Sequence, residues 1–499
     1  MNQFPQSRLR PIGYDSFRLI SVSAIVVLFL TISPPSTSQN FSDVEAKSYY
    51  VSAGSGANGD GSPSRPFRSL VEAEAISVAG DTIYLVSGNG IGELNGGIAL
   101  KSGQKLLGID SSGNLAEAED DRVKLTNTSS VLDGVMVQLA DHNEVAGIHF
   151  MDMSNYAISA LGTNYSGTYI HHTTFTGNAT EHIEDERGLV YSISLDATEG
   201  NIDNVIIENS GFYNGDDLGA IRVFHSGNSQ GNYRFQGNDF SDLGGRAYFV
   251  RTQNTSRVET IILDSNADNI GLGDRNSDSI IPYLMGQSEQ IMVIRNYHFQ
   301  NTKQVGNQSN TGIEAYMFGE PRPDEANWCT NCKLTLKILD SVIENSVTDP
   351  IQFSNSGRNS ELTYEIRNSR IVGGNPRQGG GAISLNLQGV PGSGGSTTLL
   401  VEYSDIVGST GYGFVMNNRG GDDGHAATID FGGGALGSLG NNRFIDNKRG
   451  EMRVPQYRVT ARNNWWGGGK PNIYNSEDEV WEGSKVEIEP VLDVDPRQK

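Results

Sequence analysis

The stretch IENSGF at Ile207–Phe212 recurs in modified form along most of the chain. Each copy has an apolar strand, then Asn or another small polar residue, and then, after one or two residues, an apolar residue. Clear copies read QGNDF at Gln236–Phe240, IRNYHF at Ile294–Phe299, IRNSRI at Ile366–Ile371 and GNNRF at Gly440–Phe444, and looser ones begin at Ile170, Ile338 and Val401. The copies are roughly 21 to 44 residues apart, which is the range of solenoids and propellers.

The repeat contains short runs of alternating apolar and polar residues bounded by Gly, Asn, Asp and Ser. This pattern indicates strands and turns and excludes helical repeats. A propeller would show hairpins and a steady blade length, whereas here the spacing varies while the core phrase stays constant. The sequence therefore predicts an all-β parallel β-helix, in which loops of any length leave a stack of strands.

A second strand can be aligned between the copies. Its aliphatic position should point into the coil, and alternation should turn the following residue outward. The inward position is occupied by Ile158, Ile221, Ile313, Ile351, Ile383 and Phe414, and the outward one by Ser159, Arg222, Glu314, Gln352 and Ser384. The outward residues would form a polar ladder on which an extended polymer can lie, or simply a solvated sheet face.

The repeated Asn is expected to have a structural role. Asn tolerates the left-handed conformation of a tight turn, and its amide can bond to the turns above and below. We therefore predict a ladder of inward Asn side chains at one corner of the coil.

The N-terminus predicts export. Arg8, Arg10 and Arg18 precede the apolar run 19–32, which is followed by a small-residue stretch, as in a secretory signal. We assign residues 1–39 to a signal peptide, with an uncleaved anchor as the alternative, and 40–47 to a linker. The expected location is extracellular, periplasmic or at the cell surface. A net charge of −22 excludes nucleic acid, and any membrane contact beyond such an anchor, as partners. We expect a monomer.

The chain has two cysteines, Cys329 and Cys332, in the phrase WCTNC. A zinc site needs four ligands, and neither a second Cys pair nor a His cluster lies near in the sequence. In an oxidising compartment we predict a local disulfide between them.

The beginning and the end of the chain resemble secreted right-handed parallel β-helix proteins of the pectate lyase-like superfamily. The N-terminal phrase is YYVSAGSG from Tyr49, followed by PFRSLVEA from Pro66 and GDTIYLV from Gly80, and ARNNWWGGG from Ala461 resembles a closing turn. Ser69 and Glu72 form a capping box for a short helix that should cover the open end of the coil. The expected fold is a single-stranded right-handed parallel β-helix solenoid over 48–467 with an N-terminal capping helix and a closing segment, 468–499.

The resemblance implies two classes of function. Many members cleave acidic polysaccharides by calcium-assisted β-elimination or by hydrolysis with paired carboxylates, and others are cell-surface modules without catalytic activity. The pairs Asp216–Asp217 and Asp422–Asp423 lack the companion motifs of the polygalacturonase type, and the usual pectate lyase signatures are absent. No catalytic residue is therefore transferred from the family.

Candidate site residues come from the local sequence instead. Arg222, His225, Arg246 and Arg251 are the catalytic candidates, with Tyr248, Asp216 and Asp217 as substrate-binding candidates. They cluster within about two turns of the coil and are expected to converge on one stretch of its outer face. The alternative is ordinary Arg–Asp pairing at the surface. Asp274 and Asp278 could hold calcium or form a plain polar turn, and no other metal or cofactor is predicted. The acidic run 181–187 is interpreted as a solvated loop.

Two hypotheses follow for function. The first is a secreted β-helix protein that binds a polysaccharide and, as an enzyme, cleaves it by lyase-type chemistry. The second is a noncatalytic cell-surface or extracellular protein with a structural or adhesive role.

Overall fold

The computed structural model describes residues 45–498 except 57, 87–92, 130, 163, 178–189, 199, 216–217, 273–277, 303–309, 318–328, 356, 375–379, 388–393, 419–424, 455–456 and 475–484. The predicted signal peptide lies outside these residues, as do most of the linker and the candidates Asp216, Asp217 and Asp274. The pair Asp422–Asp423 and the acidic run 181–187 also lie outside them.

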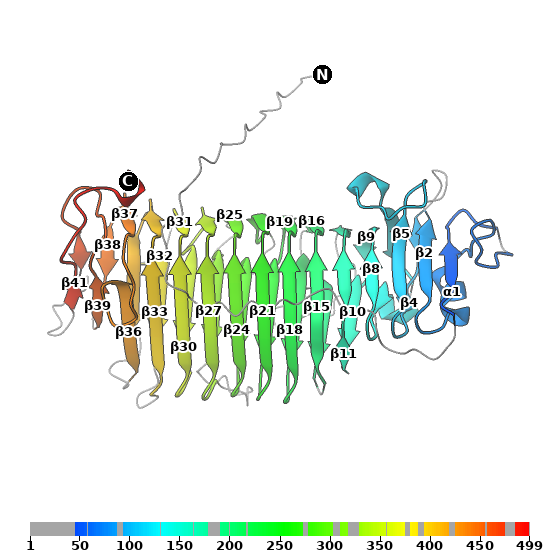
Figure 1. Cartoon of the computed structure of the whole chain (residues 1–499), viewed down its shortest axis with the longest axis horizontal. Helices are drawn as coiled ribbons and strands as arrows, with labels where there is room; N and C mark the ends of the chain where they lie inside the picture. The colour runs from blue at the N-terminus through cyan, green and yellow to red at the C-terminus, as the bar shows by residue number, and fades with distance from the viewer. Residues whose placement is uncertain are drawn as a thin grey trace, which may run out of the picture. The chain divides into compact units, whose positions relative to one another are not determined.

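The described strands form three long sheets in which neighbouring strands are parallel (Figure 1). Strands three apart in the chain pair with each other: β15 with β18, β16 with β19 and β17 with β20. Each turn of the coil therefore adds one strand to each sheet. This topology is a right-handed parallel β-helix, so the predicted fold class is confirmed.

The 16-stranded sheet comprises β1 (Ser48–Val51), β2 (Thr82–Val86), β5 (Lys105–Ile109), β8 (Glu144–Ala146), β11 (Tyr165–Ser166), β12 (Tyr169–His171), β15 (Ile202–Glu208), β18 (Gln230–Gln236), β21 (Arg257–Leu263), β24 (Glu289–Arg295), β27 (Lys333–Leu339), β30 (Glu361–Arg367), β33 (Ser396–Glu402), β36 (Ala426–Gly432), β39 (Arg458–Ala461) and β41 (Lys485–Glu487).

The 13-stranded sheet comprises β4 (Ile98–Ala99), β7 (Val137–Gln138), β10 (Ile158–Leu161), β14 (Val190–Ala197), β17 (Leu218–His225), β20 (Tyr248–Thr252), β23 (Ile280–Leu284), β26 (Ile313–Met317), β29 (Ile351–Asn355), β32 (Gly381–Leu387), β35 (Tyr412–Asn418), β38 (Gly450–Arg453) and β40 (Ile473–Tyr474).

The 12-stranded sheet comprises β3 (Leu94–Asn95), β6 (Val123–Asn127), β9 (Ile148–Met153), β13 (Thr174–Thr176), β16 (Gly211–Gly215), β19 (Asp239–Leu243), β22 (Asn266–Ile270), β25 (His298–Thr302), β28 (Val342–Glu344), β31 (Arg370–Val372), β34 (Asp405–Val407) and β37 (Arg443–Ile445).

The helices are short. The α-helix α1 spans Leu70–Ile76, and 3-10 turns lie at Glu119–Asp121, Val131–Gly134 and Pro496–Gln498. Ser69 caps α1 by accepting a hydrogen bond from the backbone N–H of Glu72, and the Glu72 carboxylate accepts one from the N–H of Arg68. Leu70 and Ala73 are buried against the coil, so the helix covers its first turns as expected. None of the helices in the described part of the chain is long and apolar enough to span a membrane.

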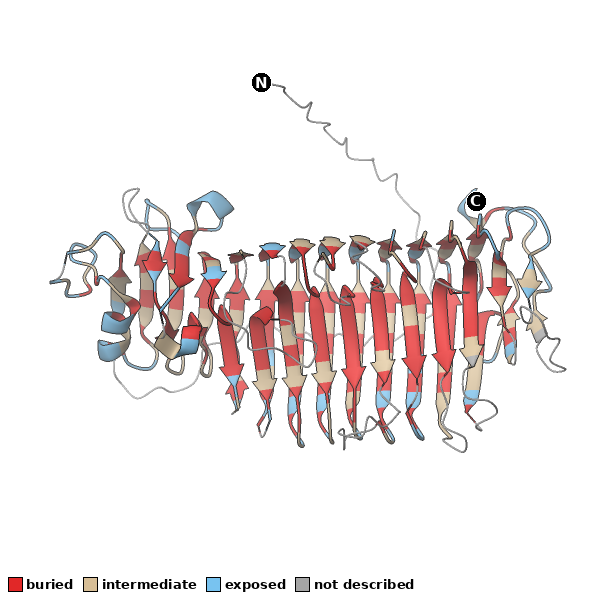
Figure 2. Ribbon diagram, turned by 180° about the vertical axis from the view of Figure 1, so that it is seen from behind, coloured by how far each residue is buried: buried red, intermediate tan, exposed pale blue. Residues whose placement is uncertain are grey.

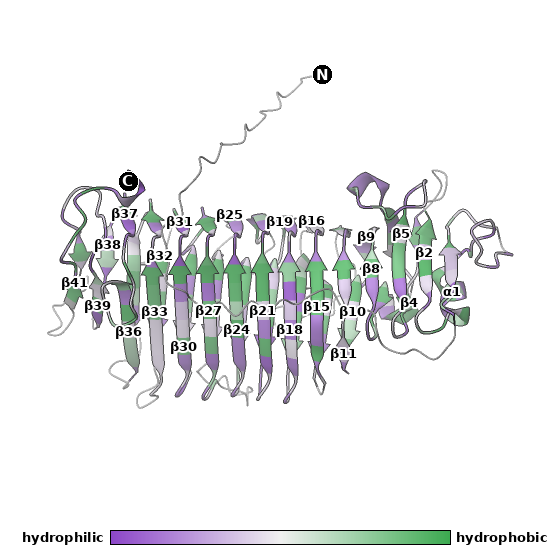
Figure 3. Cartoon of the chain, viewed as in Figure 1, coloured by the Kyte–Doolittle hydropathy of each residue, from purple (hydrophilic) through white to green (hydrophobic). Residues whose placement is uncertain are grey.

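The interior of the coil is filled by stacked apolar columns. The predicted column is present, since the strand register pairs Ile158 with Ile193, Ile193 with Ile221, Ile313 with Ile351 and Ile351 with Ile383. These side chains are buried. Figure 2 shows buried residues along most strands, and Figure 3 shows hydrophobic residues recurring at the same level in the C-terminal halves of β15, β21, β24 and β33. The regular alternation of the sequence thus produces one continuous core.

The corner after the strands of the 16-stranded sheet differs in part from the prediction. Asn238 and Asn442, in the copies QGNDF and GNNRF, are buried and point inward as predicted. In other copies the Asn adopts the left-handed conformation, with φ of 50° at Asn209, 51° at Asn296 and 49° at Asn368, but its side chain is exposed. The following residue points inward and forms the ladder. Its side-chain oxygen accepts a hydrogen bond from a backbone N–H at the same corner of the preceding turn. The bonds run from Ser210 N to Asn238 Oδ1, Asn238 N to Ser265 Oγ, Ser341 N to Ser369 Oγ, Ser369 N to Ser404 Oγ and Ser404 N to Asn442 Oδ1. One residue cannot both occupy the exposed turn and point inward, so two neighbouring residues divide the roles.

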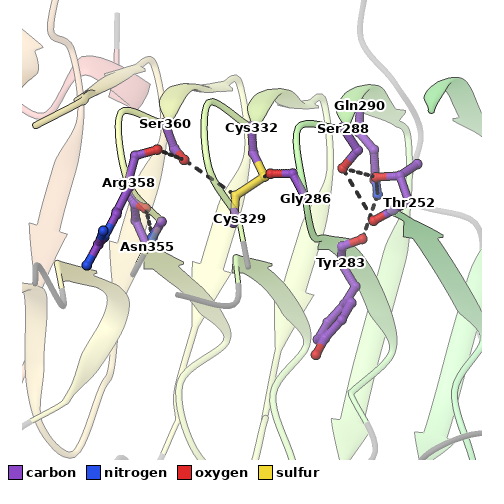
Figure 4. The surroundings of a disulfide bond; sticks show 11 residues. Thr252, Tyr283, Gly286, Ser288, Gln290, Cys329, Cys332, Asn355, Arg358 and Ser360 are labelled. Carbon is purple, nitrogen blue, oxygen red and sulfur yellow. Dashed lines mark hydrogen bonds between the residues drawn. A yellow bond between two sulfur atoms is a disulfide. The ribbon is translucent and has the colours of Figure 1, made fainter. Parts of the chain in front are cut away.

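Cys329 and Cys332 form the predicted disulfide, which is buried at another corner of the coil (Figure 4). The Cys332 sulfur lies 3.3 Å from the carbonyl oxygen of Gly286 on one side, and the Cys329 sulfur lies 3.4 Å from Ser360 Oγ on the other. Strand β27, which Cys332 immediately precedes, pairs with β24 on one side and with β30 on the other. Ser288 and Ser360 hold the same position directly before β24 and β30. The disulfide thus occupies a position that Ser fills in neighbouring turns.

We predict that alkylation of the intact protein without reductant leaves its mass unchanged, because both sulfurs are bonded and buried. The Cys329→Ser/Cys332→Ser variant should lose at most about 2 kcal/mol of stability, since the closed loop is short and Ser already fills this position in adjacent turns. Two added alkyl groups in the mass spectrum of the alkylated, unreduced protein would contradict the pairing.

Candidate functional site

The outer face of the 13-stranded sheet carries the polar ladder expected from the sequence. Because side chains alternate along a strand, the residues that follow the inward column point outward. One outward column contains Ser194, Arg222, Phe249, Ile281, Glu314, Gln352, Ser384, Val415 and Arg453, and the next contains Asp196, Phe224, Arg251, Tyr283, Tyr316, Ser354, Asn386 and Asn417. Several of these side chains are more than nine-tenths buried, including Glu314 and Ser384. Much of this face is therefore covered and is not an open, solvated sheet surface.

Arginines and aromatic rings interleave at the centre of this face. Phe224 lies between two guanidinium groups, with the Cζ atom of Arg222 5.2 Å and that of Arg251 5.3 Å from its ring centroid. Arg251 also lies 5.6 Å from the centroid of Tyr283, whose ring stacks on Tyr316 at 5.3 Å. These five residues, which we call the Arg–aromatic cluster, come from four successive strands of the sheet.

Arg222 is held by a carboxylate. Its Nη1 donates to Asp196 Oδ2 at 2.7 Å and to Ser194 Oγ at 2.9 Å, and the side chains of Arg222 and Asp196 are 14% and 16% exposed. Burial raises the pKa of the Asp196 carboxyl, and the Arg222 guanidinium opposes this rise. The expected alternative of Arg–Asp pairing is therefore correct for Arg222.

Arg246 is fully buried beside the same cluster. Its Nη1 donates to the hydroxyl of Tyr191 at 2.7 Å, and its Cζ lies 4.6 Å from the centroid of Phe249. A Cβ on Gly219 would lie 2.5 Å from the Tyr191 ring, so glycine at this position leaves the space that the ring occupies. Three of the four predicted catalytic candidates, Arg222, Arg246 and Arg251, are thus brought together.

The outward placement predicted for His225 and Tyr248 is wrong. His225 lies in the core, where Nδ1 is 3.0 Å from Ser229 Oγ and Nε2 is 2.6 Å from Tyr233 Oη. Burial lowers the pKa of His225 to about 3, so the ring is neutral at physiological pH. Tyr248 pairs in register with Ile221, and its ring stacks on Phe235 inside the coil. Both residues occupy inward positions of the alternation, so neither can contact a polymer on the outer face.

Downstream of the Arg–aromatic cluster, the face carries a hydrogen-bonded polar group. Gln352 Nε2 donates to Glu314 Oε1 at 2.8 Å. Asp349 Oδ1 accepts from Ser384 Oγ and from the N–H of Gly381, both at 2.9 Å. Burial raises the pKa of Asp349 to about 6, although these two hydrogen bonds act in the opposite direction. This carboxyl therefore titrates near neutrality.

Asp349 should make stability depend on pH. Its pKa rises from about 3.8 in the unfolded chain to about 6 in the folded one, so the folded state binds this proton more tightly. The resulting stabilisation is complete below pH 3.8 and is lost as the pH rises towards 6. The free energy of unfolding of the wild type should therefore decrease between pH 4 and pH 7 by up to about 3 kcal/mol more than that of Asp349→Asn, which lacks this titrating group. Urea unfolding of both proteins across this pH range measures the difference. Parallel stability curves for the two proteins would contradict this prediction.

The outer face of the 16-stranded sheet is organised differently. Its basic groups lie against carboxylates from neighbouring turns, as for Lys105 with Glu144 at 2.7 Å and Lys337 with Glu365 at 3.0 Å. Such pairs largely neutralise each other, as does the Arg222–Asp196 pair of the 13-stranded sheet. The 13-stranded sheet differs in placing aromatic rings beside its arginines, so the Arg–aromatic cluster is the better candidate for a sugar-binding surface.

The calcium hypothesis gains no support from Asp278. Its Oδ1 accepts from the N–H and the hydroxyl of Thr311, which links two turns of the coil. Among the described residues, no group of three or more His, Cys, Asp or Glu could hold a metal ion. Asp274 lies outside those residues.

No protein-family model matches this chain, and no curated protein matches it. Solved structures with a similar fold include GH136 lacto-N-biosidase from Eubacterium ramulus, at 11% identity with a TM-score of 0.42, covering 81% of this chain and 68% of that one. Pectate lyase Pel9A matches at 13% identity with a TM-score of 0.39, covering 74% and 80%. The A-module of the mannuronan C-5 epimerase AlgE4 from Azotobacter vinelandii matches at 11% identity with a TM-score of 0.33, covering 72% and 93%.

Proposed function

We propose that this protein is secreted as a monomer and binds an acidic polysaccharide along the outer face of the 13-stranded sheet. The observation that carries the proposal is the Arg–aromatic cluster, in which Arg222 and Arg251 flank Phe224 on adjacent turns. Guanidinium groups bind carboxylates through paired hydrogen bonds, and aromatic rings offer an apolar surface to sugar rings. On a chain of net charge −22, such a cluster is where a polyanion would bind.

The parallel stack suits a polymer for a geometric reason. Successive turns present equivalent positions about 4.8 Å apart, so amide, hydroxyl and guanidinium groups recur in a line along the coil. Gln352 continues this line beyond the Arg–aromatic cluster, whereas Ser384 and Asn386 are more than nine-tenths buried. An extended chain lying across the strands would therefore bind mainly at the Arg–aromatic cluster.

Cleavage by lyase-type chemistry is the second candidate function, and the contact between Tyr191 and Arg246 favours it. Elimination from a uronate needs a positive group near the carboxylate and a base for the adjacent proton. Arg246 would supply the positive group, and the Tyr191 oxygen, which accepts a hydrogen bond from Arg246, would be the candidate base. Tyr191 and Arg246 are fully buried, so a substrate would reach them only if this part of the face opened. Because His225 also lies in the core, binding without cleavage is the function that we favour.

The test uses the purified mature protein and a panel of polyuronates and neutral polysaccharides, with and without calcium. We expect retardation by polyuronates in affinity electrophoresis and none by the neutral polymers. Equal retardation by both, or none by either, would refute the proposed binding. Absorbance near the unsaturated uronate band then separates the candidates, because a lyase generates this signal and a noncatalytic binding protein does not.

A further inference from the structure

Two consecutive histidines contact each other at a corner of the coil. His171 is the last residue of β12 in the 16-stranded sheet, and His172 occupies the turn that follows, with a φ of 49°. Their Nδ1 atoms are 2.8 Å apart, which is hydrogen-bond distance. His171 is buried and His172 is half-buried. The pair belongs to a different sheet from the proposed polysaccharide site, so its role is separate from that site.

The backbone at this corner does not require histidine. His171 pairs in register with Glu208, so His172 corresponds to Asn209 of the next turn. Asn209 and Asn296 adopt the same left-handed conformation, with φ of 50° and 51°, and their side chains are exposed. His172 instead contacts the side chain of the residue before it. The contact between the two histidines is therefore an addition to the fold and not a consequence of its turn geometry.

Glu144, on β8, orients the ring of His171. Its Oε1 atom lies 3.3 Å from His171 Nε2, and its Oε2 atom lies 2.7 Å from Lys105 Nζ on β5. The hydrogen bond with His171 lowers the pKa of Glu144 to about 2, and Lys105 acts in the same direction, against the effect of burial. Tyr169 stacks on the His171 ring at 4.0 Å, and its hydroxyl donates to Glu208. Glu144 is therefore a carboxylate throughout the pH range in which histidine titrates, and it can only accept hydrogen bonds.

The charged groups around His172 come from other parts of the coil. Glu117 and Arg122 lie in the segment before β6, and Glu208 ends β15. Burial lowers the pKa of His172 below its usual value of 6.5. The charges of His171 and Arg122 add to this effect, and the two carboxylates oppose it. In the folded protein His172 therefore resists protonation until the solution is more acidic than pH 6.5.

A contact between two Nδ1 atoms needs one proton and one lone pair. When both rings are neutral, His171 donates from Nε2 to Glu144 and accepts at Nδ1 from His172. When one proton is added, His171 donates from both of its nitrogens, and His172 accepts at Nδ1. When both rings are protonated, two N–H groups face each other, so the contact must break.

We propose that the contact between His171 and His172 is a pH-sensitive lock, which holds the corner between β12 and β13 until a second proton binds and then releases it. The corner is joined to both adjacent turns. The backbone N–H of His172 donates to the carbonyl oxygen of Glu208 at 3.3 Å, and the N–H of Gly147 donates to that of His172 at 3.0 Å. Release of the His172 ring should loosen both of these hydrogen bonds.

The lock should open in acid. Because the pKa of His172 is lower in the folded protein than in the unfolded chain, the unfolded chain binds this proton more readily. The stabilisation from the lock is therefore complete above pH 6.5 and is lost as the pH falls through the pKa of the folded state. His149, on β9, is bonded to Thr176 and titrates separately, because burial lowers its pKa to about 4. Measurements down to pH 5 thus leave His149 largely neutral.

The experiment is hydrogen exchange, followed by mass spectrometry, of the purified protein at pH 7.5 and pH 5. After correction for the intrinsic effect of pH, the peptides that contain Gly147 and His172 should exchange at least about fivefold faster at pH 5, as expected for the loss of one hydrogen bond. His172→Asn supplies the residue that occupies this corner in other turns, so it should fold normally. In this variant the acceleration should disappear.

His298→Asn is the matched control, because it removes an exposed histidine from β25 and should leave the acceleration intact. Equal corrected rates at both pH values in the wild type would overturn the lock, as would an equal acceleration in His172→Asn. Titration of the histidine rings of the wild type by nuclear magnetic resonance gives a second test that needs no variant to fold. His171 and His172 should titrate in two coupled steps, with the second below pH 6.5. Independent titration of the two rings would also overturn the proposal.

Discussion

Ile351→Asp should destabilise the protein by at least about 4 kcal/mol, because an aspartate at this position would lie in a dry core without a partner for its charge. Ile351 is fully buried, and it stacks between Ile313 and Ile383 of the adjacent turns. The substitution removes apolar contacts with both neighbours and also buries a carboxyl group. Because a solenoid is stabilised by contacts between adjacent turns, the damage should interrupt the stack at β29.

Circular dichroism melts and urea unfolding provide the measurement, with Thr363→Asp as the matched control. Thr363 points outward from β30, one of the strands of the 16-stranded sheet, and is exposed. The same new side chain at this position should change stability by no more than about 0.5 kcal/mol. Equal melting temperatures for Ile351→Asp and the wild type would contradict the assignment of this column to the core.

The fold could be predicted because its strongest physical constraint recurs in every turn. Ile221, Ile313 and Ile351 occupy the same inward column on β17, β26 and β29, so their alignment in the sequence predicts their register in the sheet. The corner was less predictable. The sequence phrase places Asn and Ser next to each other, and both residue types can bond to the backbone. Only the backbone geometry shows that Asn209 occupies the exposed turn while Ser210 points inward.

The candidate site was predicted in part. Alternation placed Arg222 correctly, and the same rule would have placed Tyr248 inside, because it aligns with Ile221. Proximity in sequence instead predicts that Tyr248 lies with Arg222 on the outer face, and this prediction is wrong because Tyr248 is buried inside the coil. Side chains two residues apart in a strand point to the same side, so the residues two positions after Arg222 and Ile281 also point outward. These are the aromatic residues Phe224 and Tyr283. The contact between Arg246 and Tyr191 had no such signal, because it joins residues 55 apart in the sequence across the space left by Gly219.

Arg251→Glu should weaken the binding of a polyuronate by about 100-fold or more at low salt. Arg251 contacts both Phe224 and Tyr283, so its guanidinium lies at the centre of the Arg–aromatic cluster. Loss of one charge from a desolvated pair costs about 2–5 kcal/mol in binding, and the reversed charge adds repulsion. Exposed charges are screened by salt, so the difference between the variant and the wild type should narrow as the salt concentration rises.

Arg246→Glu is not a suitable substitution for this test, because Arg246 is fully buried and a new carboxylate there would disturb folding. Arg370→Glu is the matched control: it makes the same change in charge at an exposed position on the 12-stranded sheet and should leave affinity within about twofold of the wild type, because surface charges far from a ligand are screened. Equal losses of affinity in Arg251→Glu and Arg370→Glu would mean that the polymer responds to net charge alone. In that case the outer face of the 13-stranded sheet would not be the binding site, since a specific site must be more sensitive to Arg251 than to an arginine on another face.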